Sequence, residues 1–191
     1  RLKRPILIAL GFSHGYNPFD LYQDTTKYQA FLDDIEKKLI AGKPVVKTYW
    51  ENGDQLLQLL RSEEVWAAKA WEQAGWKLHE ENPNIDYFAP TSGALGWVDT
   101  FAIPSKSENV AGAYKWINCS LRPENAAFFT NRETYGTASK DAVKFLEPAI
   151  AANFTRGLPP AALANMKWYP TVPPGLEEME GRTLDRVKAA R

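Results

Sequence analysis

The chain has 191 residues, 45% of them hydrophobic and 13% aromatic, a composition typical of a folded protein with a core of ordinary size. Basic and acidic residues are balanced at 23 each, so no net charge attracts nucleic acid or an anionic membrane. The longest apolar runs, such as Ile6–Leu10, are far shorter than the about 20 residues needed to cross a bilayer. Nucleic-acid binding and a membrane-spanning helix are therefore excluded as interpretations.

The first part of the chain shows a helix, a strand and a second helix. Residues 25–39 place apolar side chains at helical spacing, which predicts an amphipathic helix. Pro44–Trp50 is β-branched and aromatic and predicts a short strand. Asn52 then turns the chain and caps a helix that continues to about Leu60.

Three further strands are predicted. Glu64–Trp71 is interpreted as a strand, although its alanines also favour a helix, and a helix over Glu72–Glu81 follows it. Ile85–Pro90 and Trp97–Pro104 are the other two strands. Strands that alternate with helices indicate an α/β layered fold with a largely parallel sheet.

After Pro104 the pattern becomes mostly helical. Helices are predicted over Asn109–Leu121, Pro123–Asn131 and Ala138–Leu146. A proline-rich tail begins at Pro159, and a closing helix covers Leu176–Ala190. No repeat or low-complexity tract interrupts this order.

Catalytic and metal-binding patterns are absent from the sequence. His14 and His79 lack metal-ligand spacing, and no phosphate-binding loop or nucleophile elbow is present. Cys119 is the single cysteine and stands in an apolar helical stretch, which predicts a packed thiol without chemistry. We therefore expect no enzyme activity, no catalytic residue, no bound metal and no cofactor.

Trp97 and Asp99 form the most informative local pattern. Alternate residues of a strand point to the same face, so the indole and the carboxylate would project together. An indole face attracts a cation and a carboxylate adds a charge-assisted hydrogen bond, so the pair suits an organic ammonium group. The alternative is a buried tryptophan beside an aspartate that caps or pairs elsewhere.

Trp71 is the second aromatic candidate. It ends a predicted strand, and ligands of open α/β sheets collect beyond the carboxyl ends of the strands. Packing of Trp71 under the following helix is the alternative reading of the same position.

Longer motifs resemble one family. The segments that carry the resemblance are Glu80–Ile85, Gly93–Pro104, Ala111–Asn118 and Leu121–Glu124. Together they resemble the periplasmic spermidine/putrescine-binding proteins, which are type II solute-binding proteins of ABC importers. The resemblance implies an α/β fold of the type II periplasmic binding class, a periplasmic location and delivery of a small solute to ABC permease subunits.

The resemblance also implies site residues. Trp97 and Asp99 match the family's polyamine-contacting tryptophan and aspartate, and Trp71 matches a tryptophan that packs on the ligand's methylene groups. Tyr135 matches a tyrosine of a glycine-tyrosine turn, although here the glycine follows the tyrosine. The ligand set is therefore Trp97, Asp99, Trp71 and Tyr135.

Two departures leave the solute open. The family's acidic pair for a second amine would fall at Arg1 and before it, and Tyr169 stands after Trp168 where the family has glutamine. A polyamine, a smaller or monocationic amine, and an unrelated solute all remain possible ligands.

The resemblance further implies a division into lobes. Residues 1–97 and 146–191 would belong to the second lobe, and residues 98–145 would return to the first as an orphaned piece. The chain would then be the carboxy-terminal part of a longer protein, and in isolation we expect it to self-associate.

Two other function classes stay open at this stage. A Cys119-dependent hydrolase would need a histidine or an acid within hydrogen-bond reach of the thiol. A carbohydrate-binding module would need two coplanar exposed indoles with no carboxylate between them.

Overall fold

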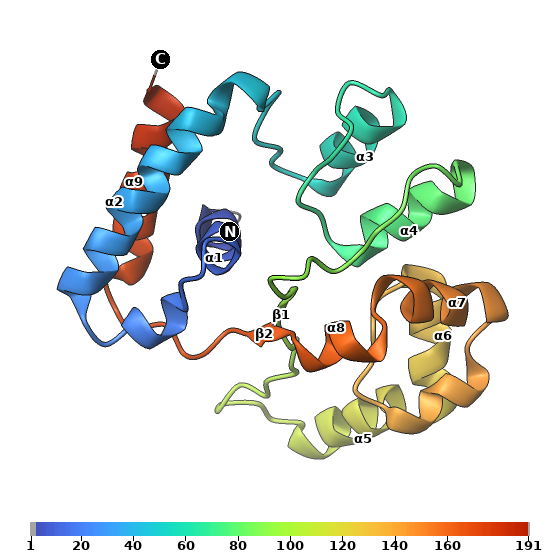
Figure 1. The fold of residues 1–191 in the computed structure, drawn as a ribbon. Coiled ribbons are helices and arrows are strands. Elements are labelled where there is room, and N and C mark those ends of the chain that lie inside the picture. The colour runs from blue at the N-terminus through green and yellow to red at the C-terminus, as the bar shows by residue number, and fades with distance from the viewer. Residues whose placement is uncertain (1–2, 191) are drawn as a thin grey trace. The chain divides into compact units, whose positions relative to one another are not determined.

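The chain forms two compact units in a computed structural model that describes residues 3–190 (Figure 1). Unit 1 comprises Arg1–Lys69, Ala89–Trp97 and Ala162–Arg191. Unit 2 comprises Ala70–Phe88 and Val98–Ala161. Each unit is described by itself below.

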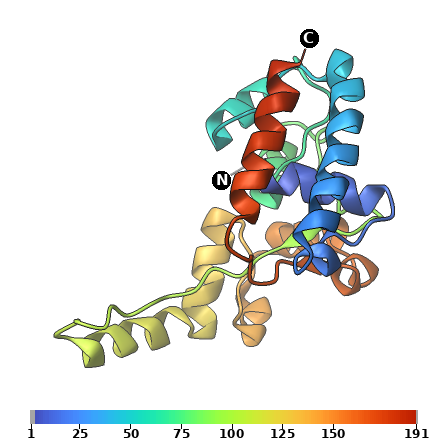
Figure 2. The same cartoon turned by 90° about the vertical axis from the view of Figure 1, so that its left-hand side faces the viewer.

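Three helices build the core of unit 1. Helix α1 covers Lys3–Ser13, α2 covers Thr25–Gly42 and α9 covers Leu176–Ala189. Both views show α2 and α9 side by side (Figures 1 and 2). Their apolar faces and the adjoining Tyr22 are buried together, and the buried members are Leu7, Ile8, Tyr22, Tyr28, Phe31, Leu32, Ile35 and Leu176.

A buried ion pair joins these three helices. Arg4 of α1 donates through Nε to both carboxylate oxygens of Glu180 of α9, at 2.8 and 3.0 Å. The hydroxyl of Tyr28 on α2 donates to the same carboxylate at 2.6 Å. Burial raises the pKa of Glu180, whereas the hydrogen bond from Tyr28 and the charge of Arg4 lower it. The carboxylate is 2% exposed, and these partners compensate its loss of hydration.

The rest of unit 1 is short helices and connections. The 3₁₀ turns η1 and η2 cover Pro18–Leu21 and Lys43–Val45. Helix α3 covers Gly53–Arg61, and its N-cap Asn52 accepts a hydrogen bond from the Gln55 N–H at 2.9 Å. Helix α8, Pro160–Ala164, lies where the chain passes from unit 2 back to unit 1.

Unit 2 is built from four helices and a 3₁₀ segment. Its helices are α4 (Glu72–Glu81), α5 (Val110–Ser120), α6 (Pro123–Glu133) and α7 (Pro148–Gly157), and η3 covers Lys140–Phe145. Trp76 of α4 is fully buried and packs edge-on against Tyr87 and Phe154, with ring centroids at 5.7 and 4.7 Å. This aromatic trio holds α4, the segment after it and α7 together.

Most of the predicted helices are confirmed. The structure places helices at 25–42, 53–61, 72–81, 110–120, 123–133 and 176–189, close to the predicted ranges. Ala138–Leu146 was expected to be an α-helix, but η3 is a 3₁₀ segment of six residues. Glu147 precedes Pro148 and has extended backbone (φ −62°, ψ 141°), so no helix continues through it. The segment before it forms only a short 3₁₀ run.

The predicted strands are wrong. Pro44–Trp50, Glu64–Trp71, Ile85–Pro90 and Trp97–Pro104 form no strand. Between residues 3 and 190, the strands are two parallel pieces of two residues each, β1 (Leu95–Gly96) and β2 (Lys167–Trp168). A largely parallel α/β sheet is therefore not confirmed for residues 3–190.

The physical reason is the lack of pairing partners. β-branched and aromatic residues favour extended backbone, but a strand forms only where a neighbour accepts and donates its backbone hydrogen bonds. Lys167 N–H finds such a partner in the Ala94 carbonyl, at 2.8 Å. No second strand in the described chain pairs with the other four segments.

Candidate functional site

The start of helix α4 carries the first candidate residues. Trp71 is the N-cap, with extended backbone (φ −83°, ψ 153°), and its carbonyl accepts a hydrogen bond from Ala74 N–H at 3.2 Å. Glu72 follows in the first turn, where a carboxylate interacts favourably with the helix N-terminus. Both side chains are partly buried.

Tyr135 is positioned by the end of helix α6. Thr134 closes that helix in the left-handed conformation (φ 60°), and its N–H donates to the Thr130 carbonyl at 2.8 Å. Tyr135 follows and is partly buried. Burial raises the pKa of its hydroxyl, and the charges of Glu72, Asp99 and Glu133 raise that pKa further.

Three of the four predicted ligand residues therefore belong to unit 2. Asp99 acts electrostatically on Tyr135, as does Glu72, the neighbour of Trp71 along the chain. These groups come from the start of α4, the end of α6 and the segment before α5. The carboxylates of Glu72 and Asp99 thus act on Tyr135, and Trp71 directly precedes Glu72 in the sequence.

Trp97 lies in unit 1, two residues before Asp99. Its side chain is 46% exposed, and Asp99 is exposed as well. We had placed both on one face of a strand, but Trp97–Pro104 is not a strand, so alternation no longer supports that arrangement. Their common role in ligand contact stays a prediction.

Glu72 is an acidic neighbour of Trp71 that the sequence analysis did not single out. Burial raises the pKa of its carboxyl group, and a hydrogen bond from its own backbone N–H lowers it. It also adds to the effect of burial in raising the pKa of Tyr87 to about 12. The available signal was an acid directly after Trp71, at the first position of a predicted helix.

Cys119 does not behave as predicted, since the thiol is exposed rather than packed. Asn125 donates through Nδ2 to the Cys119 carbonyl at 2.7 Å and to Sγ at 3.3 Å. An amide cannot activate a thiol as a base, so this contact offers no support for a Cys119-dependent hydrolase. Cys119 lies on helix α5, and none of the residues of that helix is buried.

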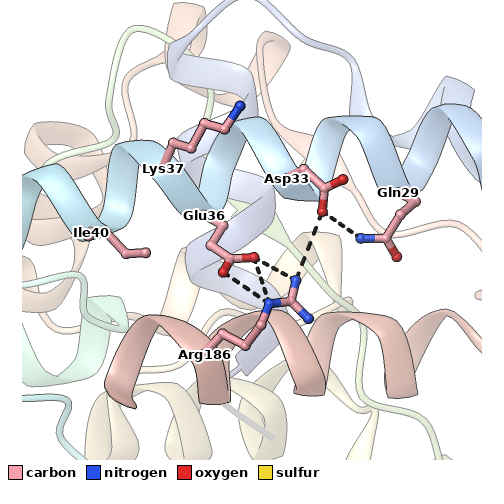
Figure 3. A pocket seen from close by; sticks show the side chains of 6 residues that line it. All are labelled: Gln29, Asp33, Glu36, Lys37, Ile40 and Arg186. Atoms are coloured by element: carbon pink, nitrogen blue, oxygen red, sulfur yellow. Dashed lines mark hydrogen bonds and ion pairs between the residues drawn. The ribbon is translucent and has the colours of Figure 1, made fainter. Parts of the chain in front are cut away.

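A shallow surface pocket lies on unit 1, and none of the predicted ligand residues lines it. It is lined by residues of α2 and by Arg186 of α9 (Figure 3). Arg186 reaches across to Glu36 and Asp33, and its Nε donates to both Glu36 oxygens at 2.9 Å. The ion pairs of Arg186 with Glu36 and Asp33 hold α9 on α2.

Residues 3–190 contain no group of three or more histidine, cysteine or acidic side chains arranged to hold a metal ion. Within the same range, no helix is both long and apolar enough to span a bilayer.

Comparison with known proteins decides the family. A family described as bacterial extracellular solute-binding protein matches residues 4–156. The chain belongs to this family. The match covers most of the chain, and it confirms the resemblance that the motifs indicated.

Curated relatives agree with the family. The chain is 26% identical over 129 residues to the putrescine-binding periplasmic protein of Escherichia coli (strain K12), which covers 66% of the chain and 34% of the relative. It is 29% identical over 145 residues to the spermidine/putrescine-binding periplasmic protein of the same organism, covering 76% and 40%. The putrescine/cadaverine-binding protein of Pseudomonas aeruginosa is 26% identical over 125 residues, covering 61% and 34%. The chain thus spans less than half the length of these relatives.

Proposed function

We propose that this member of the extracellular solute-binding family contributes to binding a small organic cation of the polyamine class. In this proposal it works as a non-enzymatic receptor in the periplasm and delivers the solute to the permease subunits of an ABC importer. The proposal is supported by the relatives, which are named for putrescine, spermidine or cadaverine. The family's bacterial extracellular character supports the location.

One observation in the structure carries the choice of a cationic solute. The carboxylates of Glu72 and Asp99 both act on Tyr135, while no basic side chain described in residues 3–190 lies at ion-pair distance from either. Glu72 is partly buried and Asp99 is exposed, and acidic groups without a basic neighbour are suited to a cation brought by the ligand. Trp71 and Tyr135 supply aromatic faces for methylene groups and ammonium groups.

The lobe assignment stays part of the proposal. We propose that residues 98–145 belong to one lobe of a type II binding protein, and that 1–97 and 146–191 belong to the other. The compact units also divide the chain between Trp97 and Val98, which supports this boundary. The compact units differ from the proposed lobes in one respect. They place residues 70–88 and 146–161 with 98–145, whereas the proposed lobes place these residues with the rest of 1–97 and 146–191.

Titration calorimetry with 1,4-diaminobutane tests the proposal. We expect Asp99→Asn to weaken binding by about 1.5–3 kcal/mol, the contribution of a charge-assisted contact, without changing the fold. Asp141→Asn removes an exposed carboxylate that already has a partner and serves as the control, since Asp141 pairs with Lys144 in η3. An affinity unchanged in Asp99→Asn would exclude this carboxylate from the site.

A further inference from the structure

Three polar atoms beside the buried ion pair of unit 1 have no hydrogen-bond partner within residues 3–190. They are Nη2 of Arg4 and the hydroxyl oxygens of Tyr22 and Tyr169, and all three atoms are enclosed by protein. Tyr22 as a whole is only 3% exposed. Buried polar atoms are normally hydrogen-bonded, because an atom that loses water without gaining a partner destabilises the fold. Three such atoms in one place therefore indicate a missing common partner.

The carboxylate of Glu180 brings two of these groups together. Arg4 donates to it through Nε at 2.8 and 3.0 Å, and the Tyr28 hydroxyl donates to it at 2.6 Å. The ring of Tyr22 packs edge-on against the ring of Tyr28, with centroids 5.4 Å apart. Arg4 and Tyr22 thus lie on the two sides of the Glu180–Tyr28 contact.

Tyr169 reaches the same place from the segment after β2. Its ring and the ring of Tyr22 each lie 5.6 Å from the ring of Phe19, measured between centroids. The charges of Arg4 and Glu180 act on the Tyr169 hydroxyl. Tyr22 acts on it as well. The three atoms without partners therefore face one small region of the unit 1 core.

The neighbouring side chains do not satisfy these atoms. Tyr28 has a single hydroxyl proton and donates it to Glu180. Its hydroxyl is near enough to Tyr22 to oppose the rise of the Tyr22 pKa to about 12, which burial causes, but the two hydroxyls form no hydrogen bond of normal geometry. Nη2 of Arg4 lies 3.4 Å from the carboxylate of Glu177, which is 80% exposed, and forms no hydrogen bond with it.

Charge and hydrogen-bonding capacity select the class of ligand. Glu180 balances the charge of Arg4, and Glu177 adds a second negative charge, so the region does not favour an anion. Nη2 of Arg4 carries only protons, which does not favour a cation. Water is neutral, accepts from a guanidinium and both donates to and accepts from a hydroxyl group. Buried waters typically make about three such bonds.

We propose that the region between Arg4, Tyr22 and Tyr169 binds one buried water molecule. The water accepts a hydrogen bond from Nη2 of Arg4 and is bonded to both tyrosine hydroxyls. It connects α1 with the residue after η1 and with the segment after β2. None of these residues belongs to the predicted ligand set, so the water site goes beyond the proposed function.

Urea unfolding of the full chain tests the site, with variants that remove a hydroxyl and keep its ring. Tyr22→Phe and Tyr169→Phe should each lower the folding equilibrium constant about three- to tenfold, because each takes a partner from the water. The double variant should cost less than the sum of the two, since both act on the same water. Tyr114→Phe removes the hydroxyl of a tyrosine of unit 2 that is 58% exposed, and as the control it should change the constant by about twofold or less.

A hydroxyl that simply lacks a partner predicts the opposite sign. In that case Tyr22→Phe would raise the folding equilibrium constant, because an unfavourable buried polar atom is removed. Magnetic relaxation dispersion of water oxygen detects long-lived internal waters directly. The dispersion amplitude should be lower in the double variant than in the unmodified chain, and unchanged in Tyr114→Phe. A more stable Tyr22→Phe variant, or an equal amplitude in the double variant and the unmodified chain, would overturn the proposal.

Discussion

Asp86 and Arg156 join the segment after α4 to helix α7 in unit 2. Arg156 donates through Nη2 to an Asp86 oxygen at 3.0 Å, and the same nitrogen donates to Asn153 at 2.9 Å. The hydrogen bond from Arg156 is the main cause that lowers the pKa of Asp86, while partial burial opposes it. Asp86 directly precedes Tyr87, which belongs to the aromatic trio of Trp76, Tyr87 and Phe154.

This ion pair predicts a pH-dependent stability. A carboxyl group whose pKa is lower in the folded state stabilises the fold above its unfolded pKa of about 3.9, and this contribution is lost as the pH falls through the folded pKa. Asp86→Asn should therefore cost about 1 kcal/mol or less at pH 6, as expected for a partly exposed pair. Urea unfolding should show the difference disappearing as the pH falls below the ordinary pKa range of a carboxyl group. A difference that is constant from pH 2 to pH 6 would contradict this assignment.

The predicted site residues stay predictions. Trp71 was indicated by a predicted strand end, Asp99 by strand alternation and Tyr135 by the family resemblance, and the structure places all three in unit 2. Glu72 was not singled out because an acid at the start of a helix already has a local explanation. Its missing basic partner is a three-dimensional property, which no spacing in the sequence expresses.

At the scale of elements, the segment that packs on helix α4 explains why residue 75 of that helix is a glycine. Gly75 lies inside the helix, where alanine would ordinarily be more favourable by about 1 kcal/mol. A Cβ atom at this position would lie 2.6 Å from Cβ of Tyr87 and 3.2 Å from its Cα. Glycine therefore allows the segment after α4 to lie directly on the helix.

We expect Gly75→Ala to destabilise the chain by about 1–3 kcal/mol, because the clash involves backbone and Cβ atoms that cannot rotate away. Urea unfolding measures the change. Gly42→Ala is the matched control, since Gly42 ends α2 with nothing within 4 Å of its Cβ position, and it should be neutral or stabilising. Equal effects of the two substitutions would show that close packing on Tyr87 is not the reason for Gly75.

Most helices were predictable, although α1 and α7 were not, whereas the strands were predicted wrongly. Thr25–Gly42 carries its periodic apolar face and its capping Asp24 within one stretch of sequence, so local information is sufficient. Trp97–Pro104 has strand-like composition, but its state depends on a partner elsewhere in the fold. The short pairing of Leu95 with Lys167 joins residues far apart in the chain, and no local pattern indicates that register.

At the scale of the whole molecule, helix α5 and its surroundings leave apolar side chains in contact with water. None of the residues of α5 is buried, and Figure 2 shows the helix beside the extended segment that precedes it. The large exposed side chains of α5, α6 and this segment are Val98, Phe101, Val110, Tyr114, Trp116, Phe128 and Phe129. A surface with so many exposed aromatic rings is typical of an interaction surface.

We expect the isolated chain to self-associate through this surface at micromolar concentration. Burial of apolar area contributes about 25 cal/mol per Å², so covering a few hundred Å² amounts to several kcal/mol. Light scattering should give a mass above 21.5 kDa, and Phe128→Lys should shift it toward the monomer. Val45→Lys changes an exposed apolar residue of unit 1 and is the control. A stable monomer at these concentrations would contradict the expectation.

The contact of Arg4 with Glu180 spans 176 positions of the chain, and that of Tyr28 with Glu180 spans 152. The entropic cost of closing a loop grows slowly with loop length, by only about 0.6 kcal/mol for each doubling. The long separation in sequence therefore lowers the free energy of unfolding only slightly. Its main effect falls on the rate, because folding slows as contacting residues become more distant in sequence. At a synthesis rate of about 5–20 residues per second, α9 is made roughly seven to thirty seconds after α2. Throughout that interval Leu7, Leu32 and Ile35 have no α9 to cover them, so the synthesis of α9 sets the earliest time at which unit 1 can fold.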